Sequence, residues 1–178
     1  MTSLPPGATI ETIAVKRLAV TIPTSYIQTI HRFRTLVPQI DLVRMRAQSS
    51  PEEIAETVRS TGTSTDFVTF TEFDHGRWIR HFPPFSDTTQ TSGENSSTSG
   101  RGIHRFIFGN PLFAIGLIRE SREAALHVPL DCGFVEQEDG STRMIILLPD
   151  GLVASHVAVS DNQALHAAAL DLGGRSTD

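Results

Sequence analysis

Apolar positions in the first sixty residues predict a strand followed by two helices. Residues Thr9–Ile22 are rich in β-branched side chains, which is typical of one long strand or two short ones. A second helix is expected to begin at Pro51, behind Ser50 as its N-cap, whereas the preceding stretch Gln39–Ser49 is ambiguous. The first helix follows Ser25, and its apolar positions recur at helical spacing: Ile27, Ile30, Phe33 and Val37.

The middle of the chain combines one clear strand with a long polar stretch. Alternation over Asp66–Phe73 predicts a strand, and Asp74-His75-Gly76 then predicts a turn. Residues Arg77–Phe82 fit either a strand or a helical turn. Residues Ser86–Gly100 contain no aromatic or aliphatic side chain, so we expect a disordered polar insertion within one domain at 86–100.

The second half of the chain predicts a strand, a helix and a hairpin. The strand Ile103–Phe108 is followed by Gly109 and by Asn110 as the N-cap of a helix over Pro111–Ile118. That helix is apolar nearly all round, which is typical of a buried helix or of one that meets a second subunit. The hairpin pairs Val128–Val135 with a central strand over Arg143–Leu148. A last helix is expected behind a capping box at Ser160 and Gln163.

This order of elements predicts an α+β fold. Strands and helices are interspersed, but the clearest connection, at Asp139-Gly140, is a hairpin. We therefore expect a two-layer antiparallel or mixed sheet with helices packed on one face. A single domain over residues 9–174 is expected, between a flexible N-terminus (1–8) and a flexible C-terminus (175–178).

Charge and composition narrow the class of protein. The chain has 15 basic and 20 acidic residues, a net charge of −5, which argues against a nucleic-acid surface. Cys132 is the single cysteine, so no intrachain disulfide is possible. No apolar run approaches the length of a membrane span, and the N-terminus lacks the regions of a signal peptide. We expect a cytoplasmic protein without a membrane or nucleic-acid partner.

Several short motifs resemble one known family. They are Asp74-His75-Gly76 after a strand, Gly109-Asn110-Pro111 with Ala114, and Pro129 followed by the EQEDG turn. Over roughly Thr65–Leu152 the chain resembles the domain of unknown function 302 family, especially its fungal branch. The resemblance implies a small two-layer α/β domain that associates as a homodimer, and it implies no function.

Two features of that family do not match this chain. Its bacterial branch often has a Pro-Cys pair where this chain has Pro129-Leu130-Asp131-Cys132. Many fungal members have a Pro-Ser pair where this chain has Pro149-Asp150. A role that rests on either pair does not transfer to this chain.

Metal and thiol chemistry receive little support from the sequence. None of the seven histidines pairs at i, i+4 on a helix with a glutamate, so no metal site and no cofactor is expected. Asp74, His75 and His81 could converge, although a turn followed by an exposed histidine explains the same residues. Cys132 lies on an apolar strand face, where a cysteine usually acts as a small inert hydrophobe.

Acid–base chemistry has two candidate carboxylates. Glu72 shares a strand face with Val68 and Phe70, and if that face points into the core, burial would raise the pKa of Glu72. The opposite parity would leave Glu72 in water. Asp131, beside Gly133 in the middle of a strand, is the second candidate acid or base.

Candidate ligand-binding residues gather around one helix start. The amides of the Gly109-Asn110-Pro111 turn could hold an anion, with His104 or Arg105 nearby, although a structural cap has the same sequence. The glycines form no dinucleotide fingerprint, which argues against a dinucleotide cofactor.

Three functional hypotheses remain. The first is a dimeric domain that binds a small organic ligand between sheet and helices, in a closed pocket with at least two of Glu72, His104, Asn110 and Asp131. The second is a cofactor-free isomerase, cyclase or lyase of fungal specialised metabolism, with Glu72 or Asp131 as base and His104 or Arg105 polarising the substrate. The third is a structural module that dimerises through Pro111–Ile118.

Overall fold

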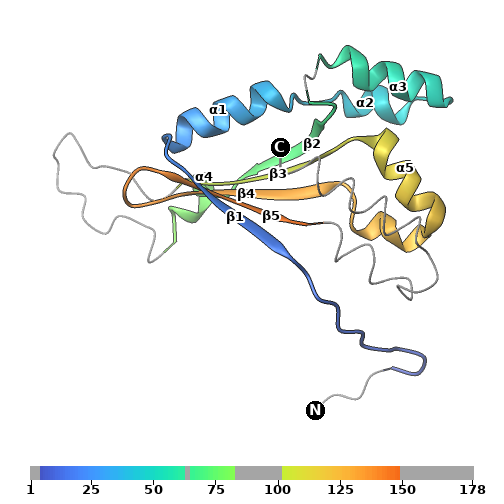
Figure 1. Ribbon diagram of the computed structural model, residues 1–178, viewed down its shortest axis with the longest axis horizontal. Coiled ribbons are helices and arrows are strands. Elements are labelled where there is room, and N and C mark those ends of the chain that lie inside the picture. The colour runs from blue at the N-terminus through green and yellow to red at the C-terminus, as the bar shows by residue number, and fades with distance from the viewer. Residues whose placement is uncertain (1–4, 63–64, 83–101, 149–178) are drawn as a thin grey trace.

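One five-stranded antiparallel sheet organises the chain. The computed structural model describes residues 5–62, 65–82 and 102–148. The strands lie in the order β1-β5-β4-β3-β2 (Figure 1). Their bounds are β1 (Arg17–Ile22), β2 (Val68–Asp74), β3 (Ile103–Gly109), β4 (Leu130–Glu136) and β5 (Thr142–Leu147).

The helices pack against this sheet, which confirms the predicted α+β fold. In Figure 1, α1, α2 and α3 lie above the sheet and α5 lies beside one end of it. The bounds are α1 (Tyr26–Leu36), α2 (Leu42–Arg46), α3 (Pro51–Ser60), α4 (Gly76–Ile79), α5 (Pro111–Glu120) and a 3₁₀ helix, η1 (Arg122–Leu126). Within the described residues no helix is long and apolar enough to cross a membrane.

Register places the aromatic core on the helical face of the sheet. Phe106 on β3 pairs with Cys132 on β4, which pairs with Ile146 on β5. All three side chains are buried, as Phe134 is. Phe33 from α1 packs on this layer, with ring centroids 4.5 Å from Phe106 and 5.1 Å from Phe134. The predicted inward face of the Val128–Val135 strand is therefore confirmed for its buried members.

A second, smaller core extends the domain past the edge strand β2. Ile40, Val58 and Val68 form it, and Met45 and Phe70 pack on its side. The segment between α1 and α2 follows the edge of β2, where Thr69 donates its amide to the carbonyl of Pro38. This pairing covers part of the β2 edge and fixes α2 and α3 beside the sheet.

The predicted helix starts agree with the structure, and the structure adds four details to the predicted elements. Ser25, Ser50 and Asn110 each cap a helix as predicted. Ile27 is 79% exposed, so it does not belong to the buried stripe of α1. Strand structure within Thr9–Ile22 is confined to Arg17–Ile22. The remaining two differences settle ambiguous stretches, since Gln39–Ser49 contains α2 and the residues after His75 begin with the helical turn α4.

Several expectations fall outside the described residues. They are the insertion at 86–100, the C-terminal helix beginning near 160, the end of the chain at 175–178 and the Pro149-Asp150 pair. Of the N-terminal stretch 1–8, the structure describes only residues 5–8.

Candidate functional site

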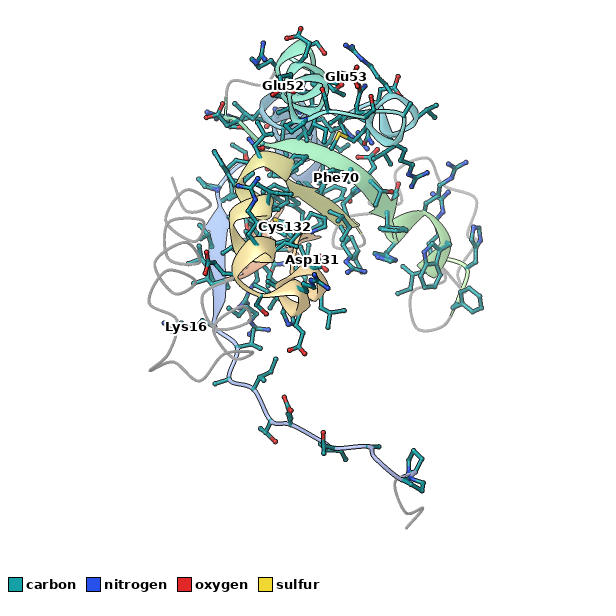
Figure 2. The ribbon with its side chains drawn as sticks, turned by 90° about the vertical axis from the view of Figure 1, so that its right-hand side faces the viewer. Lys16, Glu52, Glu53, Phe70, Asp131 and Cys132 are labelled. Atoms are coloured by element: carbon teal, nitrogen blue, oxygen red, sulfur yellow. The ribbon has the colours of Figure 1, made fainter. Side chains whose placement is uncertain are left out.

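An apolar groove lies between α5 and the α2–α3 pair. It has a volume of about 430 Å³, within the usual size range of small-molecule sites. Its floor comes from Phe70 on β2 and from Pro129 and Leu130 at the start of β4. Figure 2 shows Phe70 below the α2–α3 helices and beside α5. The walls are mainly aliphatic: Met45, Ile54, Leu112, Ala114, Ile115 and Ile118.

Helix α5 supplies one whole wall because both of its faces are apolar. Leu117 points into the main core and is 1% exposed. Positions 111, 114, 115 and 118 share the other face at helical spacing and line the groove. Leu112 and Ile115 are 39% and 47% exposed, which is unusual for such large side chains gathered along one helix. The all-round apolar pattern of this helix thus reflects one buried face and one groove face.

Asn110 is the structural N-cap of α5 and lines the groove at the start of that helix. Its Oδ1 accepts the Leu112 amide at 2.8 Å, and its Nδ2 donates to the Asp66 carbonyl at 2.6 Å. The amides of Phe113 and Ala114 donate to the Asn110 carbonyl, each at 3.1 Å. The first-turn amides of α5 are therefore satisfied internally, so the expectation that they hold an anion lacks free donors.

Glu72 and His104 meet at a different place, on the helical face near the β2 edge. Arg34 of α1 donates to both carboxylate oxygens of Glu72, at 2.9 and 3.0 Å. His104 is 4% exposed, and its Nε2 lies 3.3 Å from Glu72 Oε2 without forming a hydrogen bond of good geometry. The structure thus turns Glu72 toward the helices, but at a partly exposed edge (36% of the side chain) and not among apolar groups.

The charges in this cluster set the pKa values of its members. Burial alone would raise the pKa of Glu72, but the Arg34 hydrogen bonds and the charges of Arg34 and His104 outweigh it, so the pKa is lowered. A raised pKa was expected only for a Glu72 that faces an apolar core, and this partly exposed edge does not provide that environment. Burial lowers the pKa of His104, against the opposing charge of Glu72. Burial, helped by Asp74, raises the pKa of Tyr26 to about 12.

Asp131 and Arg105 lie on the opposite face of the sheet. The Arg105 Nε donates to both carboxylate oxygens of Asp131, at 2.8 and 2.9 Å. The neighbouring Cys132 points into the core, where burial raises the pKa of its thiol to about 12. Asp131 and Cys132, neighbours on β4, are labelled in Figure 2. At that pKa the thiol stays protonated at neutral pH, as expected for an inert buried cysteine.

The candidate residues therefore occupy three places and do not form one site. Of the four residues that we expected to share a pocket, this groove is lined by Asn110 alone. Sequence reasoning missed the groove-lining residues Phe70 and Ile54 because each sits in an apolar pattern that equally predicts core. It missed Met45 because this residue lies in the ambiguous stretch Gln39–Ser49. Among the described residues no three His, Cys, Asp or Glu side chains gather closely enough to hold a metal ion, and Asp74, His75 and His81 form no such group.

Comparisons with known proteins give a family match and a fold match. The family model described as "Domain of unknown function DUF302" matches residues 87–175, which are 89 of the 178 residues. The chain is also similar to a solved structure titled "Crystal structure of uncharacterized conserved protein DUF302 from Bacillus stearothermophilus". The TM-score is 0.53 at 17% sequence identity, covering 90% of this chain and 92% of the other. No curated protein matches the chain.

Proposed function

We propose that this chain, which belongs to the DUF302 family, binds a small apolar organic molecule in the groove between α5 and α2–α3. One observation carries the proposal: a groove of about 430 Å³ whose walls are almost entirely apolar. Full burial of a large aliphatic side chain stabilises a protein by roughly 1.5–3 kcal/mol. Leu112 and Ile115 are partly exposed, so much of this stabilisation is absent in the unliganded protein. A bound molecule that covers them recovers part of this stabilisation.

The surroundings of the groove favour a preformed site. Its floor belongs to the sheet, and α3 and α5 each begin with a side-chain cap and a proline at the first turn. Gly109 approaches Pro129 closely, since a Cβ at Gly109 would lie 3.2 Å from the Pro129 Cβ. Walls fixed in this way lose little freedom when a ligand binds, which favours affinity.

Titration with the neutral fluorescent dye Nile red tests the proposal. Ala114→Phe places a ring inside the groove and should abolish dye binding, whereas Ala125→Phe adds the same ring at an exposed position on η1 and should leave binding unchanged. Ile54→Phe fills the groove from the opposite wall and serves if the first variant is unfolded by circular dichroism. Equal binding by the filled and control variants would refute the proposal.

A second candidate function rests on the contact between Glu72 and His104. A buried, neutral imidazole 3.3 Å from a carboxylate held by Arg34 resembles the pairing of a base with the group that orients it. This supports an acid–base enzyme, but with roles exchanged from those expected from the sequence: His104 is the base and Glu72 is its positioning residue. Asp131 has no place in that arrangement, because it lies on the other face of the sheet.

Chemical modification tests whether a substrate can reach His104. Diethyl pyrocarbonate should modify the His104 peptide of the folded protein, as mass spectrometry would detect, and modification should disappear in His104→Gln. His31, exposed on α1, provides the positive control within the same sample. A His104 peptide that stays unmodified while the His31 peptide reacts would reject the enzyme hypothesis.

We also propose that the protein belongs to the fungal branch of the family, is cytoplasmic and forms a homodimer. Membership of the fungal branch rests on the motifs quoted from the sequence, and a cytoplasmic location rests on composition. A homodimer is implied by the family resemblance alone, and its expected interface, Pro111–Ile118, overlaps one wall of the groove.

A further inference from the structure

A single charged side chain, Arg119, lies at one end of the groove and indicates what kind of apolar molecule the groove binds. Among the described residues that line it, Arg119 is the only one with a charged side chain, and no acidic residue joins it. Within the described part of the chain no carboxylate forms an ion pair with Arg119. The groove therefore combines a long apolar surface with one positive charge that is not paired with a carboxylate of the described residues.

The position of Arg119 at one end of α5 defines which way a charged ligand lies in the groove. From Pro111 to Arg119 the helix rises about 12 Å, and both residues line the groove. Arg119 is exposed and lines the groove, a position from which a long basic side chain packs its aliphatic stem on apolar surface while its guanidinium stays in water. The opposite end, near Asn110, offers no free amide, because the first-turn donors of α5 are already used.

We propose that the groove binds an elongated apolar molecule with a single carboxylate, its chain lying along α5 and its carboxylate paired with Arg119. This inference rests on the proposed ligand-binding function and specifies the ligand class. A guanidinium suits a carboxylate because its donors match the two oxygens in plane. A neutral molecule of the same shape fills the same groove but leaves Arg119 without a partner.

Displacement of Nile red by decanoate and by 1-decanol tests the inference at a pH where decanoate is ionised. Both ligands should displace the dye, and decanoate should bind about threefold to fivefold more tightly, the scale of an exposed ion pair. Arg119→Gln should remove this preference without weakening 1-decanol, and Arg119→Lys should retain most of it. Arg122→Gln is the matched control, since it removes an exposed charge that does not line the groove.

The possible outcomes separate this inference from the function on which it rests. If neither compound displaces the dye from the native protein, the proposed ligand-binding function and the inference both fail. If both bind equally, or if Arg119→Gln weakens both alike, the groove binds apolar molecules but the carboxylate assignment is wrong. A preference that Arg122→Gln also removes would overturn the assignment to Arg119.

Discussion

Acidification should destabilise the folded protein through His104. The pKa of this side chain is lowered from its ordinary value of 6.5, chiefly by burial. Glu72 and Asp74 on β2 oppose this shift, whereas the charge of Arg34 adds to it. Between the folded and the unfolded pKa, the unfolded chain binds the additional proton. The free energy of unfolding therefore falls as the pH drops below about 6.5.

The size of this effect has a strict upper limit. One proton taken up on unfolding changes the free energy of unfolding by at most about 1.4 kcal/mol per pH unit. The loss begins near the unfolded pKa and stops at the lowered folded pKa. Glu72 acts in the same direction at lower pH, since its pKa is lowered too and its stabilisation disappears as the pH falls from its ordinary value of 4.5 through its folded pKa. The interval just below pH 6.5 is thus assigned to His104.

Urea unfolding between about pH 7.5 and about pH 5.5 measures this contribution. The native protein should lose more stability over the interval than His104→Gln, by up to roughly 1 kcal/mol. His31→Gln removes an exposed histidine from α1 and should leave the pH dependence unchanged. If His104→Gln does not fold, His104→Phe, which keeps a ring stacked on Phe106, replaces it. A pH dependence identical in the native and His104 variants would refute the reasoning.

Four shorter predictions concern stability, reactivity and assembly. Gly116→Ala should raise the free energy of unfolding by roughly 0.5–1 kcal/mol, because Gly116 lies inside α5 and an added Cβ would meet only open space; a lower melting temperature would contradict this. Asp131→Asn should cost at most about 1 kcal/mol in urea unfolding, as for other exposed ion pairs. Cys132 should react with a thiol reagent at mildly alkaline pH only after unfolding, so rapid labelling of the native protein would be inconsistent with its buried position. Ile115→Asp should convert a dimer held by α5 to monomers in sedimentation velocity, and an unchanged dimer would exclude that helix as the interface.

Short-range signals were sufficient to predict most of the fold. A helix cap needs only a side-chain oxygen and a free amide two or three residues later, so Ser50 and Asn110 were recognisable in isolation. The Asp139-Gly140 turn likewise fixed the hairpin, and Gly140 adopts the positive φ of +82° that such a turn favours. The exposure of Ile27 was not predicted, because helical spacing does not show which side of a helix the sheet covers.

Glu72 shows where strand parity stops being informative. Alternation placed Glu72 on one face with Val68 and Phe70, but a β-bulge between Thr69 and Thr71 breaks this parity. Glu72 pairs with Phe106 and lies on the helical face, whereas Val68 pairs with Gly109. At the edge the same face meets Arg34, and the charge of Arg34 reverses the pKa shift that burial would cause. The distance between Arg34 and Glu72 in the sequence leaves no local signal for this pair, which depends on the crossing of α1 over the edge strand.

The groove illustrates the same limit at a larger scale. Its lining comes from α2–α3, from β2, and from α5 with the start of β4, which are separate segments of the sequence. In each segment the apolar side chains satisfy a core pattern, and most of their neighbours do lie in a core. Ile115 and Leu112 remain exposed because α2 and α3 pack on their own small core around Ile40 and Val58 and leave a groove open beside α5. A hydrophobic pattern indicates that a side chain is stabilised by burial away from water. Whether other protein side chains or a bound ligand bury it depends on the arrangement of elements that are distant in the sequence.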